Sequence, residues 1–92
     1  MDQAREIQFG NSKKCWLDVN EGTAELAAVP ELTLSTYPVR GLSHGQMFIL
    51  VTRTAMPSIV KVEVSNRGTH LHASEIEQIR RTAEGIFRSQ VG

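Results

Sequence analysis

The stretch IVKVEVSNRGTHLHASEIEQIRRTAEGIFRSQ, residues 59–90, decides the fold, because it holds two periodicities in succession. Residues 59–65 alternate apolar and polar side chains, which is the pattern of a strand with one buried face. From residue 74 onward, apolar side chains recur every three or four positions, which is the spacing of one helix face. This part of the chain therefore indicates a sheet followed by a C-terminal helix.

Between these two segments the sequence predicts a β-hairpin. Asn66-Arg67-Gly68 supplies turn residues, and residues 69–73 alternate again as a return strand. Two registers are open. A two-residue turn between Ser65 and Gly68 places apolar side chains opposite apolar ones, whereas a three-residue loop ending in Gly68 shifts the pairing by one. The face pattern favours the two-residue turn.

The C-terminal helix is predicted over residues 74–90. Ser74 and Glu77 have the spacing of a capping box, in which each side chain satisfies a free backbone donor of the first turn. Gly85 costs about 1 kcal/mol relative to alanine inside a helix and indicates a close approach to a strand or a partner. The apolar stripe consists of Ile76, Ile79, Ala83, Ile86 and Phe87.

Two further strands are predicted upstream. Residues 45–54 contain the run Met47–Val51, which is apolar on both faces and suggests a central strand or cover on both sides. Residues 32–37 alternate and are bounded by Pro30 and Pro38, neither of which can donate a ladder hydrogen bond. Residues 38–45 are predicted to be a loop.

The first thirty residues are less regular. Residues 15–19 alternate as a strand, and residues 23–29 fit either a short helix or a return strand. Because strands follow one another without intervening helices, the chain is expected to be α+β. We predict an antiparallel four- to five-stranded meander sheet with one C-terminal amphipathic helix packed on one face, in a single domain of residues 1–92.

Composition agrees with one small domain and excludes some functions. The 92 residues include 40% hydrophobic and 22% charged side chains, ordinary proportions for a globular chain. Ten basic and ten acidic side chains cancel, which argues against a polyanion-binding tail or an acidic solvating region.

The sequence also predicts where the protein resides. No apolar run follows the charged start, so no signal peptide is expected. The longest apolar run, Met47–Val51, is too short for a bilayer, which needs about 20 residues. The single Cys15 cannot form an internal disulfide, as is typical of a reducing compartment. We predict a cytoplasmic protein with no membrane contact.

No motif for catalysis is present. Ser43-His44 lacks the Gly-x-Ser-x-Gly elbow of a hydrolase, and no glycine-rich phosphate loop occurs. Cys15 is interpreted as a small buried hydrophobe on a strand face rather than a nucleophile. No catalytic residue is predicted.

A metal site is one interpretation of the His-x-His pair. His70 and His72 would project from one strand face, with Glu63 and Cys15 as further ligands of a small metal protein. Two histidines on the wet face of a hairpin are the simpler interpretation. We predict neither a metal nor a cofactor.

These observations favour a non-catalytic binding module, a small regulator or inhibitor that occupies a surface of a larger protein or ribonucleoprotein. Small neutral domains of this kind are common among phage and mobile-element regulators, including anti-defence proteins. Self-association through the N-terminal strand edge would give a homodimer. Long side chains of the types that dominate interfaces supply the predicted contacts: Trp16, Tyr37, Arg40, His44, Arg67 and Arg81.

Direct RNA or DNA binding through the basic C-terminal half is the second hypothesis. Phosphate contacts of this kind position a protein on nucleic acid without reading its sequence. The residues concerned are Arg53, Lys61, Arg67, Arg80, Arg81 and Arg88. A small enzyme or metal-binding protein is the third hypothesis.

Overall fold

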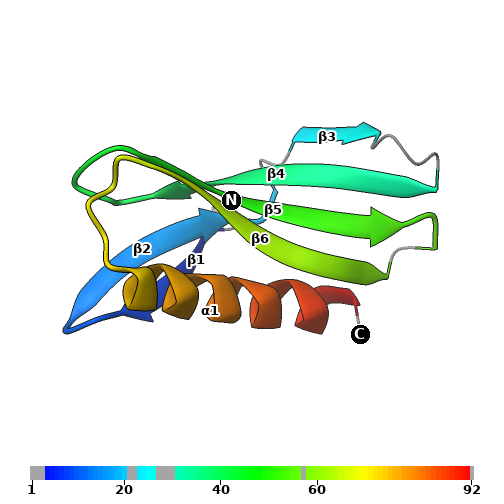
Figure 1. Ribbon diagram of the computed structural model, residues 1–92. Coiled ribbons are helices and arrows are strands. Elements are labelled where there is room, and N and C mark those ends of the chain that lie inside the picture. Colours follow the sequence, from blue (N-terminus) through cyan, green and yellow to red (C-terminus); the bar gives the residue numbers. More distant parts are fainter. Residues whose placement is uncertain (1–3, 21–22, 27–30, 57, 92) are drawn as a thin grey trace.

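The computed structural model describes residues 4–20, 23–26, 31–56 and 58–91 (Figure 1). It confirms the α+β fold, with a curved antiparallel sheet and one C-terminal helix against one face of it. The elements are β1 (Ala4–Phe9), β2 (Lys13–Asp18), β3 (Thr23–Leu26), β4 (Leu32–Arg40), β5 (Gln46–Thr54), β6 (Ile59–Arg67) and α1 (Ala73–Val91).

The sheet is a meander with one interruption. Its order is β1-β2-β4-β5-β6, and the short β3 pairs with β4. Both β2 and β3 lie on the edge of β4 that faces away from β5, β3 along residues 33–36 and β2 along residues 39–40. Pro38 falls between these two paired segments, so its missing N–H removes no bond from either pairing.

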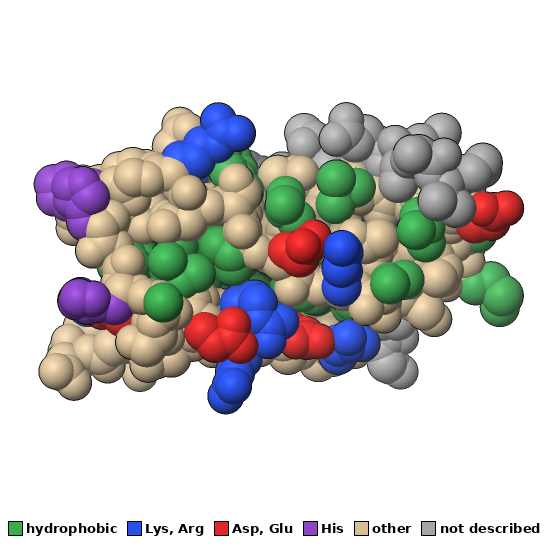
Figure 2. All heavy atoms as spheres, in the orientation of Figure 1, with side chains coloured by type: hydrophobic (Ala, Val, Ile, Leu, Met, Phe, Trp, Pro, Cys, Tyr) green, Lys and Arg blue, Asp and Glu red, His purple; other side chains and the backbone are tan. Residues whose placement is uncertain are grey.

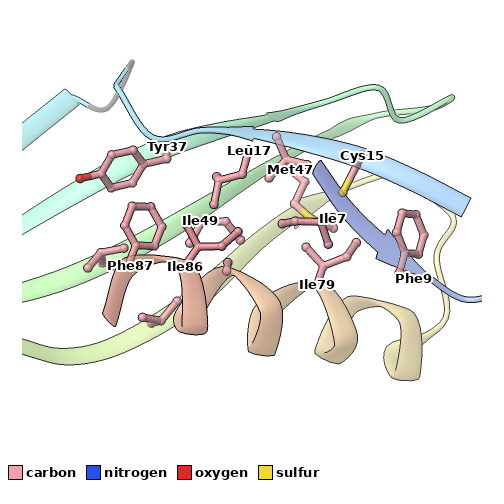
Figure 3. Packing of buried hydrophobic residues seen from close by; sticks show 14 residues of the cluster. Ile7, Phe9, Cys15, Leu17, Tyr37, Met47, Ile49, Ile79, Ile86 and Phe87 are labelled. Atoms are coloured by element: carbon pink, nitrogen blue, oxygen red, sulfur yellow. The ribbon is translucent and has the colours of Figure 1, made fainter. Parts of the chain in front are cut away.

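Strand alternation gives the sheet two different faces, which we call the covered face and the open face. The covered face packs on α1 and forms the core, shown in Figure 3. Ile79, Ile86 and Phe87 point from α1 toward the sheet, so the predicted apolar stripe is the buried side of the helix. From the sheet, the core takes Ile7, Phe9, Cys15, Leu17, Tyr37, Val39, Met47, Ile49, Val51 and Val62.

The helix also contacts both outer strands of the sheet, β1 and β6. At the β1 side, the backbone N–H of Gly10 donates to Oε1 of Gln78 at 2.8 Å. At the β6 side, Nη1 of Arg80 donates to the carbonyl of Val62 at 3.3 Å. Helix side chains thus satisfy one backbone group just beyond β1 and one within β6.

The helix begins earlier than predicted, and its cap is different. It starts at Ala73, and the backbone carbonyl of His72 accepts the N–H of Glu75 at 3.0 Å. The Glu75 carboxylate in turn accepts the N–H of His72 at 3.0 Å, so Glu75 holds the acidic position of the cap. The prediction that Ser74 and Glu77 form the capping box is therefore wrong by two residues.

The predicted hairpin is wrong as well. Strand β6 continues to Arg67, and residues 68–72 form a loop into the helix rather than a return strand. His70 has φ of 62°, a left-handed conformation that an extended strand cannot contain. Thr69 is buried, and its hydroxyl donates to the Asn66 side chain, which holds the loop against the end of β6.

Other predicted elements are confirmed with shifted bounds. Residues 45–54 correspond to β5, an interior strand, and residues 15–19 overlap β2. The predicted strand 32–37 runs on through Pro38 as β4, so the loop shrinks to residues 41–45. Residues 23–26 are a strand, and the remainder of the 23–29 segment and Pro30 lie outside the described residues. Strand β1 was not predicted.

Candidate interaction surface

The open face is the candidate functional site, because in the described part of the chain no second layer packs on it. Strand β5 contributes Phe48 and Leu50 to this face, and both side chains are half-buried. They line a groove of about 480 Å³ together with Leu34, Thr36, Ser65 and Arg67. The face therefore has an apolar centre that remains accessible.

One row of cross-strand neighbours lies along the edge of this face, at the end of the sheet where residues 41–45 connect β4 to β5. Trp16 pairs with Arg40, and Gln46 pairs with Arg67. Because Val39 pairs with Met47, the next position along the strands brings Arg40 beside Gln46. We call Trp16, Arg40, Gln46 and Arg67 the Trp–Arg row.

Local backbone geometry fixes the tryptophan of this row. A Cβ at Gly41 would lie 2.6 Å from Cε3 of Trp16, so the indole rests directly on the glycine. Gly41 also has φ of +91°, which other residues rarely adopt. Trp16 remains 38% exposed, so one side of the ring is free to contact a partner.

The structure separates the other predicted contact residues. His44 lies in the exposed β4–β5 loop beside the same end of the sheet. Arg81 is exposed on α1, where its Nε lies 3.0 Å from Glu77, away from the open face. Tyr37 is only 8% exposed, so the expectation that it is an exposed contact is wrong. Its ring centroid lies 4.5 Å from that of Phe87 in the core.

The basic residues proposed for nucleic-acid binding are not gathered into one surface. Arg80, Arg81 and Arg88 pair with Glu77 and Glu84 along the helix, where acidic and basic side chains alternate (Figure 2). Hydrogen bonds from Arg80 and Arg81 lower the pKa of Glu77 from its ordinary 4.5 to about 2. The helix arginines are thus largely neutralised by neighbouring glutamates.

The two remaining residues of that set lie apart from the helix arginines and from each other. Arg53 is turned to the covered side, where its Nη1 donates to the Tyr37 hydroxyl at 3.0 Å. Lys61 is exposed on β6, and its Nζ lies 3.6 Å from the Glu63 carboxylate. Only Arg67 of the six belongs to the Trp–Arg row.

A second feature lies at the end of the sheet, where the adjoining ends of β1 and β2 meet the β4–β5 and β6–α1 connections. They enclose a hollow of about 360 Å³ whose polar lining is Lys13, Lys14, Ser43, His44, Thr69 and His70. The histidine side chains gather at this end of the molecule (Figure 2). The sequence indicates His44 as a contact residue and His70 as a possible metal ligand, but not that the two lie together, because no local pattern links these separate segments.

The structure does not place the histidines and Cys15 where a metal site or a reactive thiol would need them. His70 and His72 lie in a loop rather than on a strand, and Cys15 is in the core. Within the described residues, no group of three or more His, Cys, Asp and Glu side chains could hold a metal ion. Burial raises the pKa of the Cys15 thiol to about 11, which keeps it protonated and unreactive.

Comparison with protein-family models finds no match, and comparisons with curated proteins and with solved structures also find none. Among the described residues, no helix is long and apolar enough to cross a membrane. Function is therefore inferred from the geometry of the surface alone.

Proposed function

We propose that the protein is a non-catalytic binding module that docks through its open face onto a larger protein, free or within a ribonucleoprotein. In this proposal it acts in the cytoplasm as a small regulator or inhibitor. The observation that supports it is the one-sided cover of the sheet. One face is closed by α1, whereas the other keeps accessible apolar side chains bordered by a tryptophan and two arginines.

The chemistry of the open face defines the partner surface that would fit. Phe48 and Leu50 offer apolar area for the centre of an interface. Trp16 and Arg67 are of the residue types that contribute most to binding energy, and arginine can fork onto a carboxylate. The matching partner surface is an apolar patch with carboxylates along one side.

The same face is poorly suited to a phosphate backbone. Glu6 lies opposite Trp16, and Glu63 lies opposite Leu50, so carboxylates are interspersed with the basic side chains. Nucleic-acid affinity derives chiefly from neutralised phosphates, and each carboxylate on the face opposes it. Mixed charge of this kind fits a protein surface better.

A site-specific photo-crosslinker tests the proposal. The crosslinking amino acid replaces Leu50 on the open face or, as the control, the exposed Thr82 on α1. Irradiation of cells that express the protein naturally should give one discrete adduct from position 50 and none from position 82. Adding Arg67→Glu should reduce the yield several-fold, because a reversed charge repels carboxylates of the partner.

Other outcomes contradict the proposal. Equal yields from the two positions would mean that the open face is not the docking surface. An adduct that disappears on nuclease digestion would assign the face to nucleic acid. An adduct with twice the mass of the chain would assign it to a second copy. No adduct from position 50 would remove the face as a docking site in those cells.

A further inference from the structure

The hollow at the end of the sheet has a composition that the proposed function does not use. None of the described residues that line it is acidic, although the chain as a whole has no net charge. Lys13 is already engaged, because its Nζ lies 2.7 Å from Oε2 of Glu75. Lys14 is held less tightly, since its Nζ lies 4.0 Å from Oε1 of Glu6, at the outer limit of an ion pair.

We propose that this hollow binds a phosphate-class oxyanion, either free or as the head group of a small metabolite. The Lys14 ammonium and the imidazoles of His44 and His70 would supply charge, and the Ser43 hydroxyl would donate a further hydrogen bond. Charge-assisted hydrogen bonds of this kind are stronger than neutral ones. The concave, three-sided site favours a small anion over an extended polymer.

The two histidines are brought together at a cost in backbone strain. The ring centroids of His44 and His70 lie 4.9 Å apart with an angle of 30° between the planes. His70 has φ of 62°, a left-handed backbone conformation that is uncommon for residues other than glycine. Backbone outliers of this kind concentrate at binding and catalytic sites.

The paired imidazoles make binding depend on pH. Two imidazolium rings this close repel each other, and a bound anion relieves that repulsion. Protonation and anion binding therefore reinforce each other, and affinity rises as the pH falls. The neighbouring elements carry further charged groups and a third histidine, namely Glu6, Lys13, Lys14, Arg40, Arg67, His72 and Glu75.

Titration of the full chain with sodium sulfate, followed by amide NMR shifts, tests the proposal. Sulfate is a suitable probe because it stays a dianion across this range, so any pH dependence reports on the protein. At constant ionic strength we expect binding at about pH 5.5 and at least about tenfold weaker binding at about pH 8. The largest shifts should fall on residues 12–14, 41–45 and 69–71.

Matched variants separate the site from general surface charge. His44→Gln and His70→Asn should each weaken sulfate binding at low pH, and asparagine tolerates the left-handed backbone of residue 70. His72→Gln, a histidine outside the hollow, should leave it unchanged. Lys14→Gln should weaken binding, whereas Lys61→Gln, an equally exposed lysine on β6, should not.

The proposal is overturned if the control variants lose as much affinity as the hollow variants, or if neither sulfate nor inorganic phosphate binds at any pH. Parallel titrations with inorganic phosphate and glycerol phosphate distinguish a free anion from a head group. Tighter binding of a short RNA that Lys61→Gln also weakens would assign the effect to a polyanion surface. These results do not depend on whether the open face docks a protein.

Discussion

The two faces of the sheet are built from the same strands but differ in what covers them. Strand β5 sends Ile49 and Val51 into the core, where both are fully buried, and sends Phe48 and Leu50 to the open face, where both are half-buried. One helix can close only one face of a sheet. An apolar strand in a domain with a single helix therefore leaves apolar area accessible, and we interpret that area as a docking surface.

The largest difference between the faces should appear in a pair of phenylalanine truncations. Phe87→Ala on the covered side removes a fully buried ring that packs on Tyr37, and it should lower the free energy of unfolding by about 3–5 kcal/mol. Phe48→Ala on the open face should cost only about 1 kcal/mol, because the ring is already partly in water. Chemical denaturation of both variants measures the difference.

The comparison fails if the two truncations cost the same. Should Phe87→Ala not fold at all, Phe87→Leu provides a milder covered-side variant that must still cost more than Phe48→Leu. Equal costs for the leucine pair would mean that the open face is covered in solution, most simply by another copy of the chain.

A second test concerns how rigidly the open face presents Trp16. Gly41→Ala would strain a backbone with φ of +91° and push a methyl group into the indole. Gly68 has φ of +72°, and a Cβ there would meet no atom within 4 Å. Gly68→Ala should therefore cost only the backbone strain, about 1–2 kcal/mol, without a steric clash. Gly41→Ala should cost more than Gly68→Ala and should shift the Trp16 fluorescence. An unshifted spectrum would contradict the contact between Gly41 and Trp16.

Low pH should destabilise the fold through the carboxylates of the helix. The Glu75 pKa is lowered chiefly by the hydrogen bond from Lys13, and the Glu77 pKa is lowered to about 2 by Arg80 and Arg81. Carboxylates with lowered folded-state pKa values stabilise the fold above their ordinary pKa and lose that contribution as pH falls. The free energy of unfolding should therefore decline from about pH 4.5 to about pH 2.

Glu77→Gln provides the control for this acid dependence, because glutamine cannot titrate. The decline with falling pH should be shallower in this variant than in the natural chain. An unchanged slope would mean that the pairs with Arg80 and Arg81 contribute nothing to the folded state in solution.

Local periodicity explains which parts of the fold were predictable. Strands β5 and β6 and the helix stripe carry complete patterns within one segment, so they could be assigned from the sequence. Strand β1 presents only Ile7 and Phe9 to the core, too few positions to establish alternation. Residues 69–73 alternate by coincidence, because five positions cannot distinguish a strand from a loop. Glu75 was missed as the cap because its role depends on a backbone that turns at His70.

The candidate site was only partly visible in the sequence. The apolar run Met47–Val51 within β5 indicated a central strand, and the structure confirms this while leaving one of its faces accessible. Trp16, Arg40 and Arg67 were singled out one by one as residue types common at interfaces. Their arrangement in one row depends on β2 pairing with β4, a neighbour relation that no local pattern encodes.

The smallest effect on stability should come from reversing the charge of exposed arginines. Such variants stay folded, so they can test directly whether the open face is the docking surface. Arg67→Glu on the open face and Arg81→Glu on the helix should each change the free energy of unfolding by no more than about 0.5 kcal/mol. The two variants remove the same charge from two faces of one fold. Any difference between them in partner binding is therefore a property of the face.

The decisive measurement is a titration of the partner captured from position 50 with both variants at two salt concentrations. We predict that Arg67→Glu weakens the affinity by at least about tenfold at low salt and by less at high salt, because the interaction is partly electrostatic. Arg81→Glu should bind within about twofold of the natural chain, as expected for an exposed change outside the interface. Equal affinities for the two variants, or a larger loss with Arg81→Glu, would contradict the assignment of the open face as the docking surface.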